Sequence, residues 1–262
     1  MSGPVFIVGS GRSGTTILRA ALHNVLNLPG DGEGHLFPIL RTITDAASDY
    51  YRRSGRRGEI EGHMLHRVGE ADMMEHLARL ARRIYFDAYD SEMFLDKTPG
   101  THGIAAISSM ESAFPQMRTI YAKRRGIEVV RSLAKKFPDT SFDVHCRQWS
   151  SCILSWYRTR SELNTPYLEI DQRDLETDTM GQCERLGSFL GLDGDTVATL
   201  STYISTNRPQ SSGSLNSGSV SLETSGWSRT EIATFRRECG LAMKLEGYAE
   251  DDSYFRSSAV PA

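Results

Sequence analysis

A glycine-rich segment near the N-terminus has the residue types and spacing of an anion-binding loop. The stretch "VFIVGSGRSGTTIL", residues 5–18, nearly fits the phosphate-loop pattern G-x-x-x-x-G-K-[ST], with Gly9, Gly14 and Thr16 in register. Thr15 stands where the pattern has lysine. Backbone N–H groups of such a turn point at one anion, and the following helix adds partial positive charge. The segment predicts a phosphate or sulfate site, and the missing lysine argues against a γ-phosphate.

Polar side chains inside the loop strengthen this prediction. Arg12 supplies a planar, permanently charged set of donors suited to an anion. Ser13, Thr15 and Thr16 add hydroxyl donors. A tight strand-to-helix turn without a ligand is the alternative. The concentration of glycine, arginine and hydroxyl residues within residues 9–16 favours a ligand site.

A second basic cluster occurs further along the chain, in "IYAKRRGIEVVRSLAKKF", residues 120–137. Lys123, Arg124 and Arg125 stand where a predicted strand becomes a helix, and Ser132 follows Arg124 by eight residues. The carboxyl ends of parallel strands line the ligand crevice of an open α/β sheet. We therefore expect Arg124 and Ser132 to bind an anion near the first loop, with a merely solvated basic run as the alternative.

Alternating strand-like and helix-like segments must position both clusters. Apolar β-branched runs predict strands at 5–9, 93–96, 118–122 and 167–170. Apolar residues at helical spacing predict helices at 15–26, 36–47, 71–89, 103–114, 127–137, 143–163, 180–190, 194–204 and 229–245. This alternation is typical of a parallel sheet with crossover helices. We expect one α/β domain over residues 1–248, with helices on both faces of a central parallel sheet, and a flexible C-terminal tail at 249–262.

The composition is that of an ordinary soluble globular protein. The 262 residues are 39% hydrophobic and 24% charged, and the net charge of −3 gives no reason to expect nucleic acid or an anionic membrane as partner. The four cysteines (Cys146, Cys152, Cys183 and Cys239) show no C-x-x-C pair and no metal-ligand spacing. We expect no metal, reduced thiols and, without a signal segment or an apolar run long enough to span a bilayer, a cytoplasmic protein.

Together, the two clusters resemble the nucleotide site of sulfotransferases that use 3′-phosphoadenosine 5′-phosphosulfate (PAPS). "GSGRSGTTIL" looks like their 5′-phosphosulfate loop, and the pair Arg124 and Ser132 is similar to their 3′-phosphate site. The tyrosylprotein sulfotransferase branch is the most similar, through residues 4–40, "FLDKTP", "YLEIDQRDL", "RLGSFLGL" and, more loosely, "GSVSLETSGW". The resemblance implies a P-loop-like sulfotransferase fold over most of the chain.

The resemblance also implies roles for the matching residues. Glu33 falls on the family's catalytic glutamate, which takes the proton of the acceptor hydroxyl, and His35 is the alternative base. Lys97 matches a lysine on the transferring sulfuryl group, whose developing charge Arg12 is also expected to stabilise. The residues implied to bind PAPS are Gly11, Arg12, Ser13, Gly14, Thr15, Thr16, Arg124, Ser132 and Ser221, with Ser219 equally placed for the last role.

Some residues depart from the family pattern or carry a structural expectation. Arg125 replaces an acidic or amide residue, and we expect it to tighten nucleotide binding or to contact the acceptor. We expect Asp96 and Asp174 to orient backbone and basic groups, and Trp149 and Trp156 to belong to the core. The branch's signal anchor and disulfide cysteines have no match, so its protein-modifying secretory role is not expected here.

We therefore expect transfer of a sulfuryl group from PAPS to an acceptor hydroxyl of a small molecule or specialised metabolite, which releases 3′-phosphoadenosine 5′-phosphate (PAP). A nucleotide or small-molecule kinase is one alternative, against which the missing lysine counts. A non-catalytic nucleotide-binding module is another, although it would need neither Glu33 nor Lys97. The acceptor, the roles of residues 45–90 and 207–226 around it, and the choice between monomer and homodimer stay open.

Overall fold

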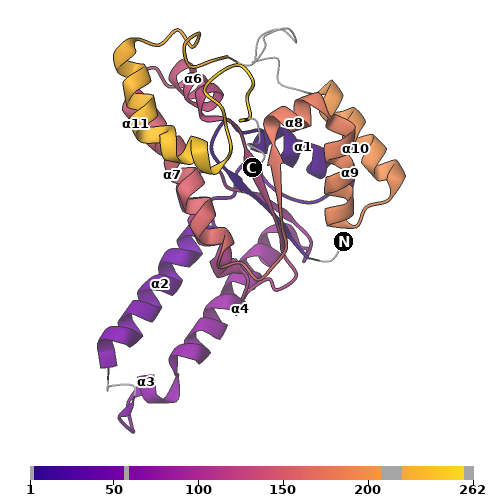
Figure 1. Ribbon diagram of the computed structural model, residues 1–262. Coiled ribbons are helices and arrows are strands. Elements are labelled where there is room, and N and C mark those ends of the chain that lie inside the picture. The colour runs from indigo at the N-terminus through magenta and orange to yellow at the C-terminus, as the bar shows by residue number, and fades with distance from the viewer. Residues whose placement is uncertain (1–2, 56–58, 208–219, 257–262) are drawn as a thin grey trace, which may run out of the picture.

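A sheet forms the centre of the fold (Figure 1). Its four strands are parallel and have the order β2-β1-β3-β4. The structure is a computed structural model that describes residues 3–55, 59–207 and 220–256. The strands are β1 (Val5–Gly9), β2 (Leu95–Lys97), β3 (Arg118–Lys123) and β4 (Tyr167–Asp171). Because all four are parallel, their carboxyl ends meet at one edge of the sheet. The expected single α/β domain with a parallel sheet is confirmed.

Helices cover both faces of this sheet (Figure 1). One face carries α1 (Thr15–Leu26), α8 (Gln172–Thr177), α9 (Thr179–Leu190) and α10 (Gly194–Thr206). The other carries α2 (Phe37–Ser54), α4 (Glu70–Tyr89), α5 (Thr101–Ala106), η2 (Ile107–Met110), α6 (Gly126–Lys136), α7 (Phe142–Arg160) and α11 (Arg229–Leu245). No helix of the described segments combines the length and the apolar character that crossing a membrane requires.

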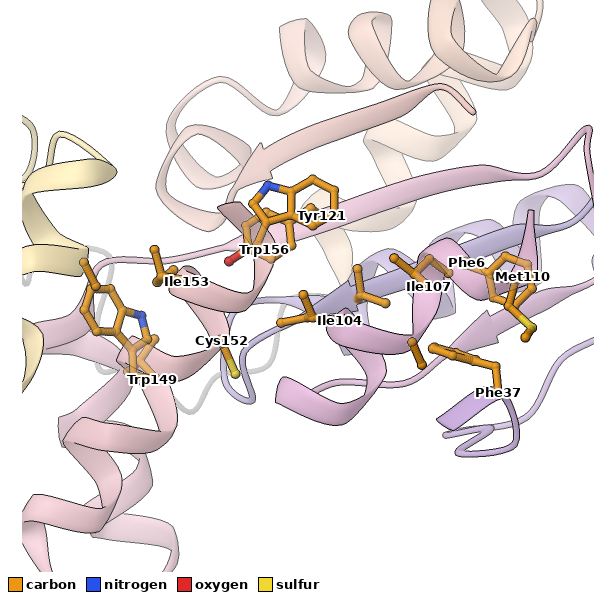
Figure 2. Packing of buried hydrophobic residues seen from close by; sticks show 14 of the residues in the cluster. Phe6, Phe37, Ile104, Ile107, Met110, Tyr121, Trp149, Cys152, Ile153 and Trp156 are labelled. Carbon is orange, nitrogen blue, oxygen red and sulfur yellow. The ribbon is translucent and has the colours of Figure 1, made fainter. Parts of the chain in front are cut away.

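Strand β1 divides the apolar interior into two clusters. Phe6 and Val8 point into the cluster under α2, α4 and α7, whereas Val5 and Ile7 point into the cluster under α1 and α9. This follows from the two-residue period of a strand. Figure 2 shows the first cluster from Phe6 to the tryptophans of α7. Trp149 and Trp156 are fully buried there, which confirms that they belong to the core.

Helices α2 and α4 extend side by side from the sheet, with α3 (Met64–Arg67) at their far end (Figure 1). The sequence predicts that the first of these helices ends at residue 47 and that residues 49–62 form a surface excursion. This is wrong for residues 49–54, which continue α2. Residues 49–54 have no apolar periodicity, and polar contacts support this part of the helix instead. Arg53 pairs with Asp49 at 3.2 Å, and the Tyr51 hydroxyl donates to the Val68 carbonyl at 2.7 Å.

The carboxylate of Asp171, at the end of β4, holds the C-terminal segment. It accepts hydrogen bonds from the hydroxyls of Tyr248 at 2.5 Å and Tyr254 at 2.8 Å. Residues 249–256, where the sequence predicts the start of a flexible tail, are therefore anchored in this structure by the buried residues Ala249 and Tyr254, whereas residues 251–253 are exposed. Residues 257–262 lie outside the described residues. Burial of the Asp171 carboxylate raises its pKa to about 6, against the hydrogen bonds that lower it.

We expect the variant Asp171→Asn to change how stability depends on pH. Because the folded-state pKa of Asp171 lies above its unfolded value, its stabilising contribution is complete below about pH 4 and is lost as pH rises through 6. The shift corresponds to roughly 3 kcal/mol. Urea unfolding of both proteins from pH 4 to pH 7 measures this: the wild type should lose stability relative to the variant over that range. Free energies of unfolding that change with pH in the same way in both proteins would contradict this role of Asp171.

Candidate active site

The loop between β1 and α1 has the backbone of an anion-binding turn. Arg12 and Gly14 have φ values of 69° and 88°, in the left-handed region. Left-handed residues in such turns bring neighbouring N–H groups onto one side of the backbone. Gly14 is also the N-cap of α1, so no side chain caps the first N–H groups of that helix. A left-handed arginine is strained and is typical of functional loops.

Buried hydroxyl groups fix the inside of this loop. The Ser13 hydroxyl donates to the Ser10 carbonyl at 2.7 Å, and the two serine hydroxyls are in contact. Ser10, Ser13 and Thr15 are buried, whereas Thr16 is exposed at the start of α1. The hydrogen bonds of Ser10 and Ser13 therefore hold the loop in its conformation before any ligand binds, whereas the hydroxyl of Thr16 is open to solvent.

The two basic clusters predicted from the sequence meet in the structure. Arg12 Nε donates to Ser132 Oγ at 2.9 Å, and Arg124 Nη1 donates to the Arg12 carbonyl at 3.2 Å. The indole N–H of Trp149 holds the Arg124 carbonyl at 3.0 Å, so the core fixes this backbone. Neither Arg12 nor Arg124 forms an ion pair with a carboxylate of the described residues. Two such guanidinium groups beside an anion-binding turn make an electropositive site.

Lys97 and Glu33 form a second group at the same edge of the sheet. Lys97 ends β2, its side chain is 4% exposed, and its Nζ donates to Glu33 Oε1 at 3.0 Å. Glu33 Oε2 lies 2.7 Å from His35 Nε2, which donates because an ionised carboxylate only accepts. Burial raises the pKa of Glu33, but hydrogen bonds from His35 and Lys97 outweigh it and leave the pKa below its ordinary value. Glu33 is therefore a carboxylate at neutral pH.

Arg125 does not belong to the electropositive site. Its side chain is fully buried and pairs with Glu128, one turn later on α6, at 2.6 Å. Its guanidinium also donates to the carbonyl oxygens of Val220, Ala249 and Asp251 at 2.7, 3.1 and 2.6 Å. The expectation that Arg125 tightens nucleotide binding or contacts the acceptor is therefore wrong, because these contacts use its donors to hold the C-terminal segment.

Ser221 follows the carbonyl that Arg125 holds. Its hydroxyl accepts from the Thr224 N–H at 3.0 Å and lies 2.9 Å from the Thr224 hydroxyl. Within the part of the chain that the structure describes, these contacts engage Ser221 in a turn, and no hydrogen bond joins it to Arg124 or Ser132. Ser219, the alternative, lies outside the described residues.

Comparison with known proteins identifies the family and the fold. Residues 4–196 match the sequence model of the Sulfotransferase family. No curated protein sequence matches the chain significantly.

Three solved structures show the similarity of fold. Sulfotransferase STF9 from Mycobacterium avium has a TM-score of 0.53 at 14% identity, over 93% of this chain and 76% of that one. The sulfotransferase domain of the Synechococcus PCC 7002 olefin synthase has a TM-score of 0.52 at 22% identity, over 82% of each chain. Mouse sulfotransferase SULT7A1, complexed with PAP, has a TM-score of 0.50 at 12% identity, over 94% of this chain and 89% of that one.

Proposed function

This chain belongs to the sulfotransferase family, and we propose that it transfers the sulfuryl group of PAPS to the hydroxyl of a small-molecule acceptor and releases PAP. The observation that carries the proposal is that two groups of residues lie at the same edge of the sheet. One is an anion-binding turn with Arg12 and Arg124 beside it, and the other is the Lys97–Glu33 pair. The first supplies binding, and the second supplies a base beside a cation.

The residues present fit a nucleotide with an anionic group at each end. The backbone N–H groups of residues 10–16 suit the 5′-phosphosulfate, and Arg124 with Ser132 suits the 3′-phosphate. Arg12 lies between them, because it belongs to the loop and its Nε reaches Ser132. The proposed set is Gly11, Arg12, Ser13, Gly14, Thr15, Thr16, Arg124, Ser132 and Ser221. The mouse relative was solved with PAP, which supports this choice of nucleotide.

The chemistry that PAPS supplies is a sulfuryl group attached to a phosphate leaving group. Glu33 takes the proton of the acceptor hydroxyl, so that the oxygen becomes a better nucleophile. Lys97 and Arg12 stabilise the negative charge that develops on the transferring oxygens, as positioned cations do in phosphoryl transfer. Lys97 is well suited to this role, since its side chain is buried and its charge is poorly screened by water. From the motifs of residues 4–40 we also propose that the chain is most similar to the tyrosylprotein sulfotransferase branch.

Calorimetric titration of the full chain with PAP and, separately, with ATP tests the proposed nucleotide. We expect tight binding of PAP and no response to ATP, because Thr15 replaces the lysine that reaches a γ-phosphate. The variant Arg124→Ala should weaken PAP binding about ten- to a hundredfold, the effect of one charge-assisted hydrogen bond. Arg53→Ala, which removes an exposed arginine at the far end of α2, is the matched control. Preference for ATP would favour a kinase and contradict the proposal.

A further inference from the structure

A buried polar network lies beneath the turn that carries Glu33. Asp96 is 1% exposed, and its Oδ2 accepts from the Tyr85 hydroxyl at 2.7 Å. Its Oδ1 accepts from the Thr98 hydroxyl at 2.8 Å. Burial raises the pKa of Asp96, although both hydroxyls oppose this shift. Burying a carboxyl group costs free energy, and the proposed sulfuryl transfer does not use the carboxyl group of Asp96.

The network reaches the active site through a backbone group. The single proton of the Thr98 hydroxyl is engaged with Asp96, so its lone pairs are left to accept. The backbone N–H of His35 donates to Thr98 Oγ1 at 2.9 Å. A continuous path of hydrogen bonds therefore runs from the His35 backbone through Thr98 to Asp96 and Tyr85.

Two further contacts hold the same turn. The Gly34 N–H donates to the Lys97 carbonyl at 3.1 Å. A Cβ atom at Gly34 would lie 2.2 Å from Asp96 Oδ2, so only glycine allows the turn to lie directly on this carboxyl group. His35 has a φ of 53°, a left-handed conformation that a residue with a side chain keeps only when its surroundings fix it.

We propose that Tyr85, Asp96 and Thr98 are positioning residues for the catalytic base. They act through the backbone of residues 34–35, which sets Glu33 at hydrogen-bond distance from Lys97 and His35. Glu33 needs this support because it lies on a loop and its side chain is 46% exposed. A misplacement of about 1 Å at a catalytic group costs about a hundredfold in rate. This inference rests on the proposed function only in assigning Glu33 as the base.

Matched hydroxyl deletions test the network. Thr98→Val removes the hydroxyl and keeps the shape of the side chain, whereas Thr98→Ser keeps the hydroxyl. Thr119→Val is the control, because Thr119 is equally buried in β3 and its hydroxyl has no partner among the described residues. We expect Thr98→Val to lower kcat about ten- to a hundredfold with unchanged affinity for PAP, and the other two variants to stay within about twofold of the wild type.

A readout without acceptor separates this inference from the proposed function. NMR of the full chain follows the pKa of the Glu33 carboxyl group and the exchange of the His35 amide proton. The charged groups that face Glu33 are Lys97 from β2 and His35 from its own loop. We expect Thr98→Val to raise the Glu33 pKa towards its ordinary value and to speed amide exchange, and Thr98→Ser to do neither.

Each outcome has a distinct meaning. An unchanged Glu33 pKa and unchanged His35 amide exchange in Thr98→Val would overturn the positioning role, whatever the protein does with PAPS. A wild type that transfers nothing from PAPS would contradict the proposed function, while the NMR result would still decide the network. If Thr98→Val does not fold, Tyr85→Phe gives the same test, because it removes only the outer donor to Asp96. Its effects should have the same direction and be smaller.

Discussion

Replacing Glu33 with glutamine should lower kcat about 10²- to 10⁴-fold, which is the usual contribution of a positioned general base. Glutamine has nearly the shape of glutamate and still offers an oxygen to Lys97, so the turn keeps its geometry. It cannot take a proton from the acceptor hydroxyl. Affinity for PAP should stay near the wild-type value, because Glu33 pairs with Lys97 and His35 and not with Arg12 or Arg124.

The measurement is the release of PAP from PAPS in the presence of an acceptor found by mass-spectrometric screening, with PAP affinity from calorimetry. Glu75→Gln provides the control, since Glu75 lies exposed on α4 and pairs only with the neighbouring Arg79 among the described ion pairs. Unchanged turnover in Glu33→Gln would remove Glu33 from the role of base. His35, whose Nε2 lies 2.7 Å from the same carboxylate, would then take that role.

Replacing Lys97 with methionine should lower kcat about 10²- to 10³-fold, the effect of removing one group that stabilises developing charge. Methionine fills most of the buried space of the lysine chain without its charge. A second effect follows from the ion pair, because Lys97 lowers the pKa of Glu33. Without Lys97 that pKa rises, so the acidic limb of the kcat profile should move to higher pH.

Steady-state kinetics over a range of pH check both effects, and Lys135→Met on the exposed side of α6 is the matched control. The two effects separate at alkaline pH, where Glu33 is ionised in both proteins. A deficit in kcat that persists there is due to the lost charge on the transferring group. A change confined to the KM of the acceptor would contradict the role of Lys97 in the transition state.

The sequence predicts the parts of this site that depend on local pattern. The loop at residues 9–16 and the strand-to-helix switch at Arg124 follow from residue spacing along the chain. That Arg12 and Ser132 meet follows from the topology, because parallel strands bring their carboxyl ends to one edge. The position of Lys97 follows for the same reason, although the structure starts β2 at Leu95 and not at residue 93.

The parts that the sequence does not predict depend on side chains that are distant in the chain. Arg125 looks like a further anion-binding residue in its basic run, but the structure engages it with Glu128 and the C-terminal segment. Tyr85 lies among the apolar residues on the buried face of α4, and nothing in the sequence indicates a hydrogen-bond partner for its hydroxyl. Only the tertiary fold, which stacks Tyr85 on Phe94 just before β2, brings that hydroxyl to Asp96. Glu128, one turn after Arg125 on the same helix, is the local feature of the sequence that indicates an ion pair for Arg125 instead of an anion-binding role.

Sulfuryl transfer is measured by incubating the protein with PAPS labelled with heavy sulfur and a panel of hydroxyl-bearing small molecules, followed by mass spectrometry. We predict that an acceptor gains a labelled sulfuryl group and that PAP forms in equal amount, with both products nearly absent for Glu33→Gln. Transfer of a phosphoryl group from ATP to the same panel, with PAPS left unconsumed, would contradict the proposed sulfuryl transfer. PAP binding without any transfer would identify a nucleotide-binding module instead of an enzyme.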